Sequence, residues 1–254
     1  MIGVVIRKEL LELRRSPALL LSMLSLPATV VVVPVALLAW LLRSAPEQTL
    51  AFIQDVYGVH AEGGLQAGVA AALARNWLPM FLVLPVFLPI LLAAQSIGGE
   101  RERRTLEPLL ATRVSTSALV LGKSIAALVP AVLITWVAAA LFCLGVDAVA
   151  GRMLLPDSAW LFGTLVLSPL LALFGNAMAV VVSSRVLDPR AAQNLAATTV
   201  LPLLALVAFQ LAGRIALGPR FYFALAAGVV VSDAALIAVA SRLFDRERLL
   251  TSWR

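Results

Sequence analysis

The chain has 254 residues, of which 61% are hydrophobic and only 13% are charged, and its formal net charge is +6. Soluble domains are about 45–50% apolar and about 25% charged, so this chain has too few polar groups to cover a globule in water. The composition excludes an ordinary soluble enzyme, a disordered tail and a nucleic-acid-binding domain, and we expect no nucleic-acid partner.

Histidine and cysteine each occur once, as His60 and Cys143. A thiolate metal cluster or a two-histidine zinc site needs more ligands than this, so we expect no metal site. A Ser-His-Asp triad would have to use His60, which we interpret as a loop residue. Cys143 lies in an apolar run and is expected to be a small packing residue.

Residues 1–15 are predicted to form an amphipathic helix that lies in the membrane interface. Its apolar face is expected to consist of Ile2, Ile6, Leu10 and Leu13. Its charged face is expected to carry Lys8, Glu12 and Arg15. The alternative is that this segment simply continues the first membrane span.

Residues 16–254 are expected to form one transmembrane domain. A bilayer core about 30 Å thick needs about 20 apolar residues in a helix. Long apolar runs meet this length at about 16–42, 76–99, 117–146, 158–184, 191–213 and 219–241. The runs do not alternate as barrel strands do, so helices satisfy the backbone in hydrocarbon. We therefore predict an all-α membrane protein with six transmembrane helices.

The basic residues predict the orientation of these spans. With six spans both termini share a side, and that side holds fifteen of the twenty Lys and Arg residues, in segments 1–15, 100–123, 185–190 and 242–254. Cytoplasmic loops carry an excess of Lys and Arg, so we expect both termini in the cytoplasm and a multi-pass protein of the cytoplasmic (inner) membrane.

Segment 43–75 is the only long external connection that the spans leave. Pro46 is suited to the first turn of a short helix, and Gly63–Gly64 would end it. We expect a second short helix over 65–75, before the second span begins.

The cytoplasmic loop after the second span carries dense charge of both signs. The pairs Glu100–Arg104 and Arg103–Glu107 have the i,i+4 spacing that supports a helix. Leu106, Leu109 and Leu110 add an apolar stripe. Such a helix could dock into a groove on another protein. Alternatively, it is a solvated helix end whose charges only fix the topology.

This loop resembles the signature of the type-2 ABC transporter permeases. In that family a run E-[RK]-E-x-x-T-L-E-x-L-L follows the second span, and residues 100–110 have the same pattern. Val114-Ser115 and Val120-Leu121-Gly122-Lys123 extend the likeness. Arg104 departs from the family, which often has glycine there. The matching residues are Glu100, Arg101, Glu102, Arg103, Arg104, Thr105, Leu106, Glu107, Leu109 and Leu110.

The resemblance implies a mechanism and a set of partners. The chain would be the membrane subunit of an ABC exporter, and residues 100–110 would form the coupling helix that contacts the ATPase. Two copies of an ABC ATPase subunit and a second permease, in a homodimer, would complete the transporter within the membrane lipid. ATP and Mg²⁺ would be bound by the ATPase, and no cofactor by this chain.

The segment Gly122-Lys123-Ser124 copies the end of a phosphate-binding loop. The first glycine of that motif should stand at Ser117, and a predicted membrane span follows instead of a strand–loop–helix unit. We therefore interpret Lys123 as a cytoplasmic anchor and expect no ATPase site in this chain.

Asp233 is predicted to lie near the middle of the sixth span, where a charged residue is costly. It either lines or gates a translocation pathway, or is a buried acid bonded to neighbouring polar groups. Asn176 and Gln210 are further pathway candidates, and Gln95 is another polar residue within a span. Interhelical hydrogen bonding is the more common role for such amides.

Two other function classes remain to be weighed. An intramembrane enzyme needs paired polar catalytic groups at one depth, and an ion-coupled secondary transporter usually has several intramembrane acids. Asp233 is the only charged residue deep in a predicted span, so the exporter permease is the leading hypothesis. The substrate class stays open among lipid, glycan, drug, peptide and cation.

Overall fold

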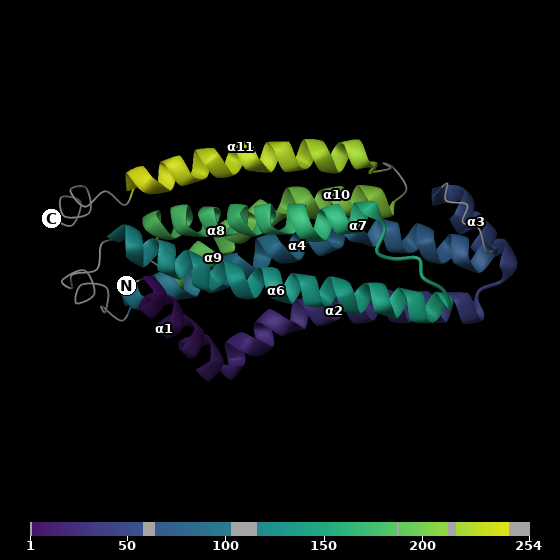
Figure 1. The fold of residues 1–254 in the computed structure, drawn as a ribbon, viewed down its shortest axis with the longest axis horizontal. Coiled ribbons are helices and arrows are strands. Elements are labelled where there is room, and N and C mark those ends of the chain that lie inside the picture. The colour runs from purple at the N-terminus through teal and green to yellow at the C-terminus, as the bar shows by residue number, and fades with distance from the viewer. Residues whose placement is uncertain (1, 58–63, 103–115, 187, 213–216, 244–254) are drawn as a thin grey trace.

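The computed structural model describes residues 2–57, 64–102, 116–186, 188–212 and 217–243. All regular elements in these ranges are helical (Figure 1). They are α1 (Ile2–Arg15), α2 (Pro17–Ser44), α3 (Glu47–Tyr57), α4 (Leu65–Glu102), α6 (Thr116–Ala150), α7 (Ser158–Phe162), η1 (Gly163–Leu167), α8 (Ser168–Arg185), α9 (Pro189–Ala197), η2 (Thr198–Val200), α10 (Leu201–Leu211) and α11 (Pro219–Leu243).

Six helical stretches of the described chain are long and apolar enough to cross a membrane. One of them is the whole of α2, and three are parts of α4, α6 and α11. The other two are composite, because α7, η1 and α8 run on from one another, as do α9, η2 and α10. These stretches are Pro17–Ser44, Leu65–Leu92, Leu121–Ala150, Ser158–Ser184, Ala191–Gln210 and Pro219–Ala240. The predicted all-α fold with six spans is confirmed.

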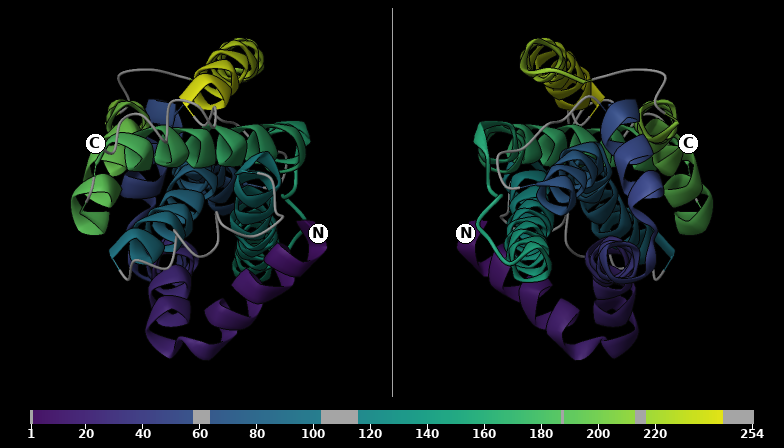
Figure 2. Two further views of the ribbon diagram at one scale, coloured as in Figure 1. Left: turned by 90° about the vertical axis from the view of Figure 1, so that its left-hand side faces the viewer. Right: turned by 90° about the vertical axis from the view of Figure 1, so that its right-hand side faces the viewer.

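The core of the bundle is α4. It packs against α8, α6, α9, α10, α3 and α2, and most of its apolar side chains are buried. By contrast, α2 and α11 lie on opposite outer sides of the bundle (Figure 2). Their outward side chains include Leu21, Val32, Phe223 and Val231, which are more than half exposed. Because the flanking helices are apolar on the outside, these faces suit contact with lipid.

The expected short helix over 65–75 is wrong as a separate element. Helix α4 begins at Leu65 and continues without a break to Glu102, with Pro79, Pro85 and Pro89 inside it. The sequence predicts a break at Arg75 because a charged residue is costly within an apolar span. In the structure Arg75 is paired with Asp157 and lies within the continuous helix α4.

Helix α1 is separate from the first span. Ser16 has an extended backbone (φ −107°, ψ 91°) and Pro17 opens α2, which rules out a continuous helix from residue 2 to 44. The location of the predicted apolar face in the membrane interface stays a prediction. Val5 is buried against the bundle with Ile6, Leu13 and Glu9 partly buried, whereas Leu10 is 38% exposed.

The two ends of the described chain lie at the same end of the bundle. The start of α1 and the end of α11 are at the left in Figure 1, and α3 lies at the opposite end. The charge distribution assigns the left-hand end to the cytoplasm. An even number of spans produces this arrangement, and the side on which the ends lie stays a prediction.

Candidate transport and coupling sites

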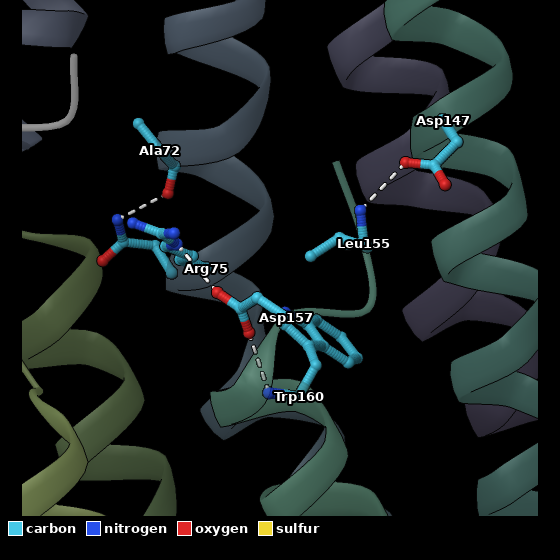
Figure 3. Close-up of polar contacts among 7 residues, drawn as sticks. Ala72, Arg75, Asp147, Leu155, Asp157 and Trp160 are labelled. Carbon is cyan, nitrogen blue, oxygen red and sulfur yellow. Dashed lines mark hydrogen bonds and ion pairs between the residues drawn. The ribbon is translucent and has the colours of Figure 1, made fainter. Parts of the chain in front are cut away.

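An ion pair joins two spans at the end of the bundle opposite the described termini. Arg75 of α4 donates from Nε to Asp157 Oδ2 at 2.9 Å, as Figure 3 shows. The other carboxylate oxygen, Asp157 Oδ1, accepts the backbone N–H of Trp160 at 2.9 Å. Asp157 is therefore the N-cap of α7, where a carboxylate satisfies an otherwise unpaired N–H and faces the positive end of the helix.

A second carboxylate holds the segment that leads into α7. Asp147, near the end of α6, accepts the backbone N–H groups of Leu154 at 2.8 Å and Leu155 at 3.1 Å. These bonds fix the connection between α6 and α7. Two acids and one arginine thus tie α4, α6 and α7 together at this end.

Aromatic packing continues this junction into the bundle. Trp160 has no exposed surface, and its ring lies 5.1 Å from Phe81 of α4 and 5.0 Å from Phe142 of α6, measured between centroids. Phe81 and Phe142 also contact each other at 4.8 Å. Such ring pairs add stability beyond their buried area, so the first part of the fourth span is held firmly against the second and third spans.

A buried ion pair lies at the opposite end. Lys123 Nζ of α6 is 3.1 Å from Glu9 Oε1 of α1, and the two side chains are only 6% and 11% exposed. Lys8 also lies 3.7 Å from Glu9 Oε1. The pair fastens α1 to the first turns of the third span, directly after the segment that carries the charged motif. The charge of Lys123 is thus paired within the fold, and its role as a cytoplasmic anchor stays a prediction.

The position of Lys123 in α6 also decides whether Gly122-Lys123-Ser124 has the structure of a phosphate-binding loop. Gly122, Lys123 and Ser124 all lie inside α6, which is helical on both sides of them. A phosphate loop needs a strand before the loop and a helix after it, with backbone N–H groups free to surround the phosphates. These residues do not have that arrangement.

The three polar pathway candidates are all buried. Asp233, Asn176 and Gln210 are 3%, 3% and 4% exposed. Asp233 lies on α11, which packs mainly on α8, the helix that carries Asn176, whereas Gln210 lies on α10, which packs on α4. Within the described ranges, both Asp233 oxygens, Asn176 Oδ1 and Gln210 Oε1 lack hydrogen-bond partners. The predicted interhelical bonds to these four atoms are therefore not formed there, and no such bond joins the three residues.

The predicted coupling residues are only partly described. The backbone of Glu100, Arg101 and Glu102 forms the end of α4, so the second span passes through Gly98–Gly99 into the charged motif as one helix. Arg103, Arg104, Thr105, Leu106, Glu107, Leu109 and Leu110 lie outside the described residues. The side chain of Gln95 is also outside them.

Comparison with known families decides the class of this protein. The model of the family described as "ABC-2 family transporter protein" matches residues 4–241. The chain belongs to the ABC-2 transporter family. No curated protein matches it.

Membership of the ABC-2 family confirms the resemblance found in the sequence. The match to the family model covers α1 through α11 almost completely, so it includes the first helix as well as all six spans. This chain is thus a multi-pass membrane protein and a membrane component of an ABC transporter. An ABC-2 membrane component works with an ABC ATPase, which indicates that this chain does not need a catalytic site of its own.

The structure also supplies contacts that the sequence analysis missed. Arg75 and Asp157 are 82 positions apart in the chain, and Glu9 and Lys123 are 114 apart. The one available signal was that each charged residue stands beside an apolar run, where an unpaired charge is costly. Such a charge is expected to have a partner, but the sequence does not identify which residue it is.

Proposed function

We propose that this ABC-2 family chain is the permease subunit of an ATP-driven exporter in the cytoplasmic membrane. Two ATPase subunits and a second copy of the permease would complete the transporter. The observation that carries the proposal is the E-R-E-x-x-T-L-E-x-L-L pattern at residues 100–110, which directly follows the second span of a chain matched by the family model. The excess of Lys and Arg on the same side supports a cytoplasmic location.

In the proposed mechanism residues 100–110 bind the ATPase. α4 runs unbroken from the core of the bundle to Glu102, so a displacement of the coupling segment would be transmitted along a continuous helix. ATP binding drives transport only if it stabilises one packing of the two permeases more than the other. The ion-coupled transporter and the intramembrane enzyme are the competing proposals, and autonomous gradient-driven uptake or hydrolysis would favour them.

Substitutions in the coupling segment test this proposal. We expect Glu102→Lys and Leu106→Asp to abolish co-purification of the ATPase, because they reverse a charge and place a carboxylate in the apolar stripe. Insertion of the permease should be unchanged. Glu47→Lys and Phe52→Asp are matched controls, since both residues are exposed on α3 at the far end of the bundle. The proposal fails if both coupling variants retain the ATPase at the level of the controls.

Asp233 is proposed to contribute to the conformational change. Both its oxygens are buried without a partner in the described chain, and an isolated charge there is unfavourable. We expect Asp233→Asn to leave insertion and assembly intact but to change the ATP hydrolysis rate of the complex several-fold. Ser232→Ala is the control, because the Ser232 hydroxyl bonds only its own helix at Gly228 O in the described contacts. Equal rates for both variants would indicate a purely structural acid.

A further inference from the structure

The fourth span contains a segment of π-helix. Residues Gly163–Leu167 form η1, between α7 and α8, and the backbone N–H of Ser168 donates to Gly163 O, five residues earlier. In an α-helix that N–H would donate to Thr164 O. The next residue, Pro169, has no N–H to offer. The carbonyl of Thr164 is therefore deprived of its usual backbone donor.

Two side chains donate hydrogen bonds to Thr164 O in place of the missing backbone N–H. The indole Nε1 of Trp136, on α6, donates to Thr164 O at 2.7 Å. The hydroxyl of Ser168 donates to the same oxygen at 2.6 Å, and it lies 3.2 Å from Trp136 Nε1. An unsatisfied carbonyl is costly in hydrocarbon, where no water can replace the lost donor. Trp136 thus stabilises the π-helical segment from a neighbouring span.

The segment lies between two firmly packed regions. Before η1 in the chain, α7 is held by the Arg75–Asp157 ion pair and by Trp160. After η1, the backbone of Gly175 in α8 lies so close to α4 that a Cβ at Gly175 would be 2.3 Å from Val86 O. Sharp bends in helices occur at π-bulges and near proline. Any change in angle between the two fixed regions would be concentrated in η1.

We propose that Trp136 is a positioning residue that latches a hinge in the fourth span: its hydrogen bond to Thr164 O holds Gly163–Leu167 in one conformation, and opening of this bond lets α8 change its angle to α7. The use of this hinge in a transport cycle rests on the proposed exporter function. The local latch does not, because all its atoms belong to this chain.

Distance measurements between spin labels test the latch. The full chain, with Cys143→Ala, is labelled at Leu161→Cys and Ser184→Cys in lipid nanodiscs. These positions are 23 residues apart, roughly 35 Å in a straight helix. We expect Trp136→Phe, which keeps an aromatic ring but removes the N–H, to broaden the distance distribution about two-fold. Ser168→Ala keeps the tryptophan and should broaden it less.

Two controls separate the latch from general loosening of the bundle. Trp40→Phe makes the same change at a position on α2 that is 62% exposed, and it should leave the distribution unchanged. A label pair at Phe223→Cys and Val239→Cys, both exposed on α11, should not respond to Trp136→Phe. The inference is overturned if Trp136→Phe does not broaden the Leu161–Ser184 distribution, whatever Ser168→Ala does. Equal broadening on α11 also overturns it.

A final measurement addresses the transport cycle. If the ATPase co-purifies, ATP should shift the Leu161–Ser184 distance in the wild-type complex and not the α11 distance. An unchanged distance in an active complex would refute the hinge while leaving the permease function intact. Failure to isolate any ATPase complex would instead refute the proposed function, and the nanodisc result would still decide the latch.

Discussion

Substitution of Gly175 by alanine is expected to lower the thermal unfolding midpoint of the chain more than any other single methyl addition at a described glycine. A Cβ at this position would lie 2.3 Å from Val86 O and 3.0 Å from Val86 C, which are backbone atoms of α4. A flexible side chain could move away, but backbone within a helix cannot. The α4–α8 contact is the most extensive between helices of the described chain.

The expected size of this effect follows from overpacking. Added methyl groups in a well-packed core typically cost about 1–3 kcal/mol and occasionally more. The two helices have to move apart, so we expect Gly175→Ala at the upper end of that range. The measurement is thermal unfolding in detergent, followed by the fraction of chain that still elutes as a monodisperse peak in size-exclusion chromatography.

Gly228→Ala provides a matched control. Gly228 lies within α11, and a Cβ there would meet nothing described within 4 Å. Alanine is the better helix former by about 1 kcal/mol in a helix interior, so this variant should be as stable as the original chain or more stable. If Gly175→Ala unfolded at the same temperature as Gly228→Ala, the close approach of α8 to α4 would be disproved.

Replacement of Lys123 by methionine is expected to release α1 from the bundle. The change leaves Glu9 in a site where its side chain is only 11% exposed, without its 3.1 Å partner. Removal of one partner of a buried ion pair typically costs about 3–5 kcal/mol, because the other charge stays desolvated. Lys8, at 3.7 Å, offsets part of this cost, so we expect the lower end of that range.

Detachment can be measured by limited proteolysis. Arg14 and Arg15 precede the break at Ser16, so trypsin should remove α1 from Lys123→Met several-fold faster than from the original chain. The exchanged pair Glu9→Lys with Lys123→Glu should restore most of the resistance. Lys8→Met is the control, since Lys8 is 42% exposed and exposed ion pairs contribute about 1 kcal/mol or less. Equal cleavage of Lys123→Met and Lys8→Met would show that the buried pair does not hold α1.

The location of this ion pair connects stability with coupling. Lys123 follows the end of the charged motif at Leu110 by 13 positions in the sequence, and α1 packs on α6. A permease whose α1 has been released would therefore be expected to lose support next to the proposed ATPase contact. Measurement of ATPase co-purification with Lys123→Met would show whether the two properties are linked.

The number of spans could be predicted because hydropathy is a local property of the chain. A run of about 20 apolar residues has to be placed in hydrocarbon whatever its neighbours are. The charged motif at residues 100–110 could be recognised for the same reason, since its order along the chain carries the signal. The prediction of a separate helix over 65–75 is wrong because Arg75 is a charge whose partner, Asp157, is distant in the sequence.

The sequence by itself determined the membrane class, the six spans and the family, because these depend on composition and on the order of residues within short segments. Only the tertiary structure decided which buried charges pair, where α8 approaches α4 and which indole supports Thr164 O. These contacts depend on the rotation and tilt of each helix relative to its neighbours. Those angles are fixed by packing of side chains across the whole bundle, and no local pattern in the chain encodes them.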